Sequence, residues 1–285
     1  MINGLLLLLV VIFVSAQQVT KKGFSGRVSG GAMTFSAASC AAALVVFLIT
    51  SGGKLEITTA YLGYAALFAL SYGAAVVFGV LAVQTGPLSL TSLLTSFSLL
   101  VPTFYGIVVL NEPVSVTLYV GLALLMIALV LINLEKKGEK KQITLRWVVY
   151  VLLGFVGNGA CSTVQKVQQL AHNGAYKSET MIVALCMCIV GMGICALVME
   201  RGQIKESLKK GVVFYVPCGL ANGVVNFMMI LLATRMDASV MFPVISGGGI
   251  VLAFLISILF YKEKLSRWQI LGSALGLVSV VLLNL

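Results

Sequence analysis

Uncharged polar side chains inside long apolar stretches are the residues of this sequence best suited to bind a solute. Asn222 and Asn226 lie four positions apart, so a helix places both on one face. Asn158 and Gln165 form a similar stripe in an earlier stretch. An amide in hydrocarbon must find a hydrogen-bond partner or line a wet cavity. These residues therefore line a path for a solute, or else they join neighbouring helices by hydrogen bonds.

No arrangement of residues in the sequence predicts catalysis. The G-x-S-x-G, H-E-x-x-H and phosphate-loop motifs are absent, and no carboxylate falls near the centre of an apolar stretch. This absence argues against proton exchange centred on a carboxylate. The cysteines lie inside apolar stretches and have no metal-ligand spacing with His172, the single histidine. We therefore expect no catalytic residue, no metal site and no cofactor.

The composition is that of an integral membrane protein. The 285 residues are 60% hydrophobic and 10% charged, with a mean hydropathy of +1.07, whereas about a quarter of a soluble sequence is charged. Backbone groups in lipid must pair internally, and a helix needs about 20 residues to cross. We predict an all-α integral membrane fold with ten transmembrane helices. The predicted spans are 2–20, 33–51, 61–83, 88–110, 115–134, 147–166, 179–199, 211–233, 238–260 and 268–284.

An internal repeat organises these spans. Residues 110–134 align without gaps on residues 261–285 at an offset of 151, with 9 of 25 positions identical. We expect a first five-helix repeat over 1–134, a charged linker over 135–146 and a second repeat over 147–285. An odd number of spans per repeat inverts one copy relative to the other. Inverted repeats of this kind enclose a central cavity with a site near the membrane midplane.

The repeat alignment adds candidates to the amide stripe. Ser71 occupies the position equivalent to Asn222, with Tyr72 beside it, and Gln17 aligns with Gln165 at an offset of 148. We expect solute recognition by neutral hydrogen bonds and aromatic contact. The predicted binding residues are Asn222, Asn226, Asn158, Gln165, Ser71, Tyr72 and Gln17.

Glycine and proline mark two positions where a helix is expected to bend. Gly247, Gly248 and Gly249 follow one another, and each weakens a helix by about 1 kcal/mol relative to alanine. Pro102 interrupts the hydrogen bonding of the fourth span. We predict that these four residues are conformational elements.

The distribution of charge predicts the orientation of the chain. Of 19 Lys and Arg residues, 15 lie on the side of the linker and four on the other. The positive-inside rule places the linker in the cytoplasm and both termini outside. The net charge of +10 then serves topology and contact with anionic lipid, so we expect no binding of nucleic acid.

Four residues at span ends are expected to have structural roles. Glu112 and Glu263 occupy equivalent positions just before spans five and ten, where a carboxylate can accept hydrogen bonds from the first N–H groups of the following helix. Trp147 and Trp268 stand at the cytoplasmic ends of spans six and ten. We expect both indoles to anchor their helices at the membrane interface.

These features resemble the drug/metabolite transporter superfamily, and in particular a ten-span protein with two EamA-like repeats. The segments Leu110–Pro113 and Tyr261–Lys264 carry the resemblance, each followed by a span that contains glycine, together with basic residues Lys21 and Lys166. The resemblance implies a cavity lined mainly by spans 1, 3, 4, 6, 8 and 9. Members carry small organic solutes, often outward. They usually have cytoplasmic termini, which differs from the orientation that the charge count predicts.

The expected function is secondary transport, as an exporter of a small organic metabolite or drug, by alternating access and without enzymatic activity. The expected partners are the solute and the lipid bilayer of a bacterial inner or plasma membrane, and no oligomeric state follows from the sequence. Two alternatives stay open. One is a non-transporting membrane scaffold or partner subunit. The other is a membrane enzyme that acts on a lipid-linked substrate.

Overall fold

The computed structural model describes residues 2–28, 30–53, 55, 56, 58–86, 91, 94–133, 143–261 and 266–283. For residues 2, 133, 250, 251 and 253–261 it describes the backbone alone. Most of the predicted linker and Glu263 therefore lie outside the described residues.

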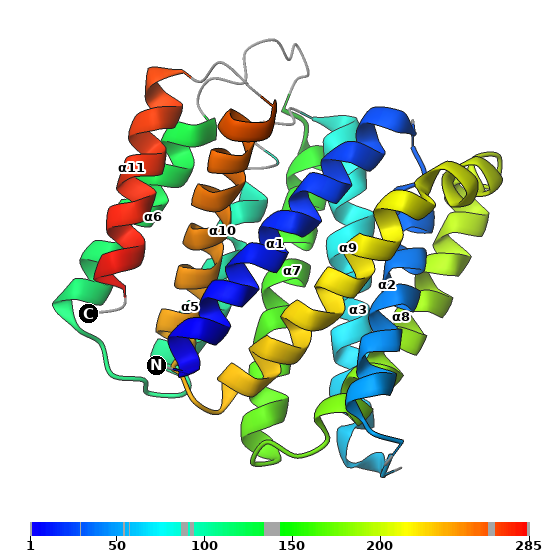
Figure 1. The fold of residues 1–285 in the computed structure, drawn as a ribbon, viewed down its shortest axis with the longest axis horizontal. Helices are drawn as coiled ribbons and strands as arrows, with labels where there is room; N and C mark the ends of the chain where they lie inside the picture. The colour runs from blue at the N-terminus through cyan, green and yellow to red at the C-terminus, as the bar shows by residue number, and fades with distance from the viewer. Residues whose placement is uncertain are drawn as a thin grey trace. The chain divides into compact units, whose positions relative to one another are not determined.

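Helices make up almost the whole described chain, and none of the described residues forms a strand, so the all-α prediction is confirmed. The predicted first repeat contains α1 (Ile2–Arg27), α2 (Ala32–Thr50), η1 (Thr59–Tyr61), α3 (Leu62–Thr85), η2 (Phe97–Leu99), α5 (Leu100–Val108) and α6 (Val116–Asn133). The second contributes α7 (Leu145–Ala171), α8 (Lys177–Met199), α9 (Ile204–Ala233), α10 (Ala238–Tyr261) and α11 (Arg267–Leu282) (Figure 1).

Several helices are long and apolar enough to cross a membrane. The described residues contain six such helices by length and composition, and shorter apolar helical stretches lie at Leu94–Val108, Val116–Ile132, Ala238–Gly249 and Arg267–Leu282. Three helices extend at least five residues beyond the predicted spans at one end, since α1 ends at Arg27, α7 ends at Ala171 and α9 begins at Ile204. Helical hydrogen bonds continue into the polar ends of these segments, which hydropathy does not detect.

The helices group into two compact units that cut across the sequence repeats. Unit 1 comprises Met1–Val77 and Val164–Arg235, and unit 2 comprises Phe78–Thr163 and Met236–Leu285. Each unit takes helices from both repeats, and α3 and α7 contribute one part to each. The repeats are defined by sequence similarity and the units by contacts between helices, so the boundaries of the two need not coincide.

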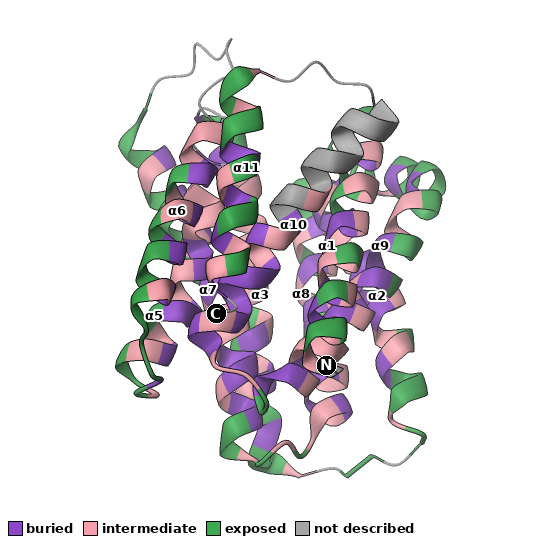
Figure 2. Cartoon of the chain, turned by 60° about the vertical axis from the view of Figure 1, so that its left-hand side comes forward, coloured by how far each residue is buried: buried purple, intermediate pink, exposed green. Residues whose placement is uncertain are grey.

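Within unit 2, α6 and α11 pack side by side in opposite directions (Figure 1). A Cβ atom on Gly121 would lie 2.8 Å from Leu283 Cγ, and one on Gly272 would lie 2.8 Å from Ile132 Cγ1. The bare glycine backbones therefore let the two helices approach closely, as small residues do in membrane proteins. Exposed and buried residues occupy different faces of α11 (Figure 2).

Within unit 1, α2 packs against α8 and α9, and α1 packs against α9. Cβ atoms added to Gly219 and Gly223 of α9 would collide with the backbone oxygens of Ser39 and Ala43 in α2. The two glycines thus form the close helix contact that their spacing predicts.

Glu112 does cap a helix, but not the helix predicted. The residue is 8% exposed, and its carboxylate accepts from the backbone N–H groups of Ala238 (2.7 Å) and Ser239 (2.8 Å) at the start of α10. The prediction assigned it to the helix that follows in sequence. Ser115 instead accepts from the N–H of Leu118 there, and the carboxylate reaches the helix that lies beside α5.

Glu200 plays the same part in unit 1. Its carboxylate accepts from the backbone N–H groups of Met33 (2.8 Å) and Thr34 (2.9 Å), and from the Thr34 hydroxyl (2.9 Å). Negative charge at a helix N-terminus satisfies unpaired donors and meets the positive end of the helix dipole.

The prediction for Trp147 is wrong. Its side chain is 4% exposed, and the indole N–H donates to the Thr91 hydroxyl at 2.9 Å. Gly86 faces the ring closely enough that no Cβ atom would fit between them. The Trp147 side chain therefore joins α7 to the segment that contains Thr91 within unit 2. Trp268, by contrast, is 49% exposed.

Candidate functional site

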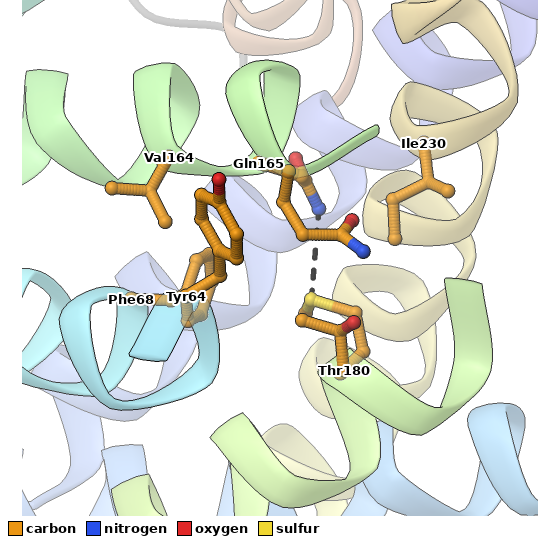
Figure 3. A pocket seen from close by; sticks show the side chains of 8 residues that line it. Tyr64, Phe68, Val164, Gln165, Thr180 and Ile230 are labelled. Atoms are coloured by element: carbon orange, nitrogen blue, oxygen red, sulfur yellow. Dashed lines mark hydrogen bonds between the residues drawn. The ribbon is translucent and has the colours of Figure 1, made fainter. Parts of the chain in front are cut away.

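A small hollow in unit 1 collects several of the polar side chains. Four helices line it, with Tyr64 and Phe68 from α3, Gln165 and Gln168 from α7, Thr180 and Met181 from α8, and Ile230 from α9, together with Val164 (Figure 3). No lining residue is charged. The space left inside is about 10 Å³, which is room for about one water molecule.

The hollow lies near the helix ends rather than at mid-helix. Tyr64 is in the first turn of α3, Thr180 is in the first turn of α8, and Gln168 is three residues before the last residue of α7. Three residues of helix span about 5 Å.

A chain of three amides leads from the hollow towards the middle of α9. Gln165 Nε2 donates to Asn226 Oδ1 at 3.2 Å and to Met181 Sδ at 3.7 Å. Asn226 Nδ2 donates to the Asn222 backbone carbonyl at 2.9 Å and also to Asn222 Oδ1. Three predicted binding residues are thus connected in one network.

The Asn222 carbonyl sets the direction of this network. A carbonyl oxygen can only accept, so Asn226 must turn its nitrogen towards it. Asn226 Oδ1 then faces Gln165, and Gln165 must turn Nε2 towards Asn226. Gln165 Oε1 is left with no hydrogen-bond partner among the described residues.

Aromatic rings flank the amides. Tyr64 packs edge-to-face against His172 with 5.6 Å between ring centroids, and Tyr176 packs edge-to-face against His172 at 5.5 Å. Phe68 stacks on Tyr72 at 6.5 Å. The Nε2 atom of His172 and the Oε1 atom of Gln169 are buried and have no hydrogen-bond partner in the described part of the chain.

The remaining predicted binding residues have different surroundings. Tyr72 lies beside Ser36 and Cys40 of α2. Ser71 and Gln17 are buried in unit 1 but do not line the hollow. Asn158 belongs to unit 2, where Nδ2 donates to Ser98 Oγ at 2.5 Å. The structure therefore unites Gln165, Asn222 and Asn226 but not the full predicted set.

The predicted conformational residues differ in local structure. Pro102 follows the tight turn η2, and the Thr103 hydroxyl donates to the Leu99 carbonyl at 2.8 Å, so the helix is irregular where proline removes a donor. Gly247–Gly249 lie within the continuous helix α10. A Cβ atom on Gly247 would lie 2.9 Å from Val280 Cγ2 and 3.1 Å from Leu125 Cδ1, which gives this glycine a packing role as well.

Comparison with known proteins supplies the family. Residues 145–285 match the model of the EamA-like transporter family. Through residues 145–285, the chain carries an EamA-like transporter domain. It is accordingly a multi-pass membrane protein of the drug/metabolite transporter kind, and the resemblance found in the sequence is confirmed. None of the curated proteins compared with this EamA-like transporter matches it significantly.

A solved structure shares the fold of this EamA-like transporter. A crystal structure of a protein, 12% identical in sequence, aligns with a TM-score of 0.79 over 98% of this chain and 95% of its own. At that identity the likeness concerns the fold alone.

Sequence reasoning did not include Tyr64, Phe68, Gln168, Thr180 and His172 in the site of this EamA-like transporter. A usable signal exists for α3, because Tyr61, Tyr64, Phe68 and Tyr72 repeat at the three- and four-residue spacing of one helix face. Thr180 and His172 carry no such pattern. Their place follows from side chains of separate helices that meet around the hollow and the Tyr64 ring, which the sequence does not specify.

Proposed function

We propose that this EamA-like transporter is a secondary carrier that exports a small organic solute by alternating access. The observation that carries the proposal is the amide network that runs from Asn222 through Asn226 to Gln165 at an uncharged hollow. Burying three amides in a membrane protein is costly unless they pair or meet a ligand. The Oε1 atom of Gln165, at the end of this network, has no hydrogen-bond partner among the described residues, which favours a ligand there.

Alternating access rests on two inverted five-helix repeats among ten spans, and the packing of α6 on α11 supports that architecture. The offset of 151 relates Gly121 to Gly272 and Ile132 to Leu283. Gly121 contacts Leu283, and Gly272 contacts Ile132. Equivalent positions thus exchange partners between antiparallel helices, which is the mark of a two-fold relation.

Unit 1 supplies similar support from other residues. The offset of 148 that aligns Gln17 with Gln165 also aligns Cys40 with Cys188. Cys40 and Cys188 are in side-chain contact between α2 and α8. A contact between equivalent residues is what a two-fold relation between the repeats would produce, so it supports the proposed inversion.

The solute would interact first with Gln165, Asn222 and Asn226. Ser71, Tyr72, Gln17 and Asn158 remain further candidates by residue type. Pro102 and Gly247–Gly249 would bend during the cycle. With the linker in the cytoplasm and both termini outside, the hollow would lie towards the outer face of the membrane, since α7 ends there.

Flux from proteoliposomes tests this function. The protein is reconstituted into vesicles loaded with a mixture of metabolites, and released solutes are identified by mass spectrometry. We expect at least one solute to leave these vesicles faster than it leaves protein-free vesicles prepared with the same detergent. We expect the Asn226→Ala variant to release that solute more slowly than the unmodified protein. Vesicles that retain every solute would favour a scaffold, and chemical conversion of a lipid-linked substrate would favour an enzyme.

A further inference from the structure

We infer that unit 1 binds the headgroup of an anionic phospholipid where α1 ends and α9 begins (Figure 1). The inference does not depend on the solute or on transport itself. Positive charge is concentrated at this end of the unit, in seven basic residues with exposed side chains. They are Lys21, Lys22, Arg27, Arg201, Lys205, Lys209 and Lys210. The opposite end of the unit carries charges of both signs, among them Glu56, Glu179, Lys177 and Arg235.

The two carboxylates at the basic end leave most of this charge uncompensated. The Glu200 carboxylate is occupied by the backbone N–H groups at the start of α2. Glu206 pairs with Lys210, with 2.7 Å between Oε1 and Nζ. Lys205 and Lys209 form no ion pair with any of the described residues. Clustered charge of one sign attracts ions of the other sign, so this surface attracts an external anion.

Close packing of α1 on α9 brings the basic residues of the two helices together. A Cβ atom on Gly23 of α1 would lie 2.5 Å from Phe214 Cε1 of α9, so the bare glycine permits the contact. The Arg27 guanidinium lies over the Phe214 ring, 5.3 Å from its centre. Lys210 is one helical turn from Phe214. Cations from both helices therefore add to the positive potential around the start of α9.

An exposed apolar stripe continues from the lysines along α9. Lys205, Lys209, Val212, Val216 and Leu220 recur at three- and four-residue spacing, so they share one face of the helix. All five side chains are exposed. The stripe from Lys209 to Leu220 spans about 16 Å, close to half of the roughly 30 Å hydrocarbon core. Its length therefore matches an acyl chain in one leaflet.

An anionic phospholipid fits both the lysines and the stripe. Its phosphate would meet the ammonium groups of Lys205 and Lys209, and an acyl chain would lie along Val212, Val216 and Leu220. A lipid with a choline headgroup carries its own cation, which the lysines would repel. A soluble anion would leave the apolar stripe without a partner. Basic residues near a membrane surface each contribute about fivefold to the affinity for anionic lipid.

Native mass spectrometry of the purified protein in a neutral detergent tests the inference, because it counts bound lipids and gives the Kd of the first one. The probes are dioleoyl phosphatidylglycerol and dioleoyl phosphatidylcholine, which share their acyl chains, and glycerol 3-phosphate, which has the phosphate without the chains. We expect phosphatidylglycerol to bind at least about tenfold more tightly than phosphatidylcholine. Glycerol 3-phosphate at the same concentration should not displace it.

Two double variants remove the same charge at opposite ends of unit 1. Lys205→Gln with Lys209→Gln should weaken phosphatidylglycerol binding at least about tenfold and leave phosphatidylcholine binding unchanged. Lys177→Gln with Arg235→Gln is the matched control and should leave both Kd values unchanged. Comparison of the two variants separates a local site from an effect of net charge.

Three results would overturn the inference. Equal Kd values for the two lipids would show that the headgroup is not recognised. An equal loss of phosphatidylglycerol binding in both double variants would assign the preference to net charge. Displacement of the lipid by glycerol 3-phosphate would assign the lysines to a soluble anion. Proteoliposomes that export no solute would reject the transport function and leave the lipid site standing.

Discussion

Gly106 lies directly against the carboxylate of Glu112, so closely that a Cβ atom on the glycine would overlap Oε2. The Glu112 backbone N–H also donates to the Gly106 carbonyl at 3.1 Å. The missing side chain at Gly106 thus makes room for the cap of α10.

Gly106→Ala should lower the stability of the protein by about 1–3 kcal/mol, because the added methyl group pushes the carboxylate from the start of α10. The midpoint temperature of unfolding in detergent measures the effect. Gly63→Ala is the control, since a Cβ atom on Gly63 has nothing within 4 Å and alanine favours a helix. Equal midpoints for the two variants would contradict the close contact.

Glu112→Gln should cost about 1–2 kcal/mol, since the side chain keeps its shape but loses charge-assisted hydrogen bonds to Ala238 and Ser239. Glu200→Gln should behave alike at the start of α2. Glu206→Gln should change little, because Glu206 is 55% exposed in its ion pair with Lys210. Thermal unfolding of the three variants ranks them, and an unchanged midpoint for Glu112→Gln would reject the capping role.

Alanine at both Asn222 and Asn226 should abolish binding of the exported solute with little loss of thermal stability. The two amides hydrogen-bond mainly to each other and to Gln165, so their joint removal leaves few orphaned partners. Ligand-induced shifts of the unfolding midpoint report binding. A destabilised variant whose folded fraction still binds would show that the amides only join helices.

Paired cysteines should reveal the two-fold relation between α6 and α11. In a background without the native cysteines, Gly121→Cys with Leu283→Cys and Gly272→Cys with Ile132→Cys should both form disulfides in mild oxidant. Gly121→Cys with Ile132→Cys should not, since about 16 Å of the same helix separates them. Cross-linking of only one of the first two pairs would refute the exchange of contacts.

The existence of the helices follows from the sequence more readily than their partners. An apolar run of about 20 residues has few alternatives to a helix in lipid, and Ala32–Thr50 coincides almost fully with its predicted span. The partner of Glu112 lies 126 positions away in sequence. No local pattern encodes that distance, and the capping role was therefore assigned to the wrong helix.

The candidate site was predictable in part for a similar reason. Gln165, Asn222 and Asn226 are scarce types in apolar spans, so residue type alone selects them. Asn158 is of the same type, yet it bonds to Ser98 in unit 2. Trp147 has the residue type of an interface anchor, and its burial follows from Gly86, which makes room for the ring. Residue type therefore predicts candidate binding residues, and the packing of the helices determines which of them come together.

The exchanged contacts of α6 and α11 affect how the chain tolerates mutation. Gly121 contacts Leu283 and Gly272 contacts Ile132. Because each glycine is aligned with the other and Ile132 is aligned with Leu283, the same type of contact occurs twice. A substitution made at both aligned positions would weaken both contacts. A loss of about 1 kcal/mol in the free energy of unfolding would then become about 2 kcal/mol, and a shift of about fivefold in the folding equilibrium would become about thirtyfold. The equivalent positions 132 and 283 already carry different residues, isoleucine and leucine. Divergence between the two halves thus allows each contact to be adjusted by single, smaller steps.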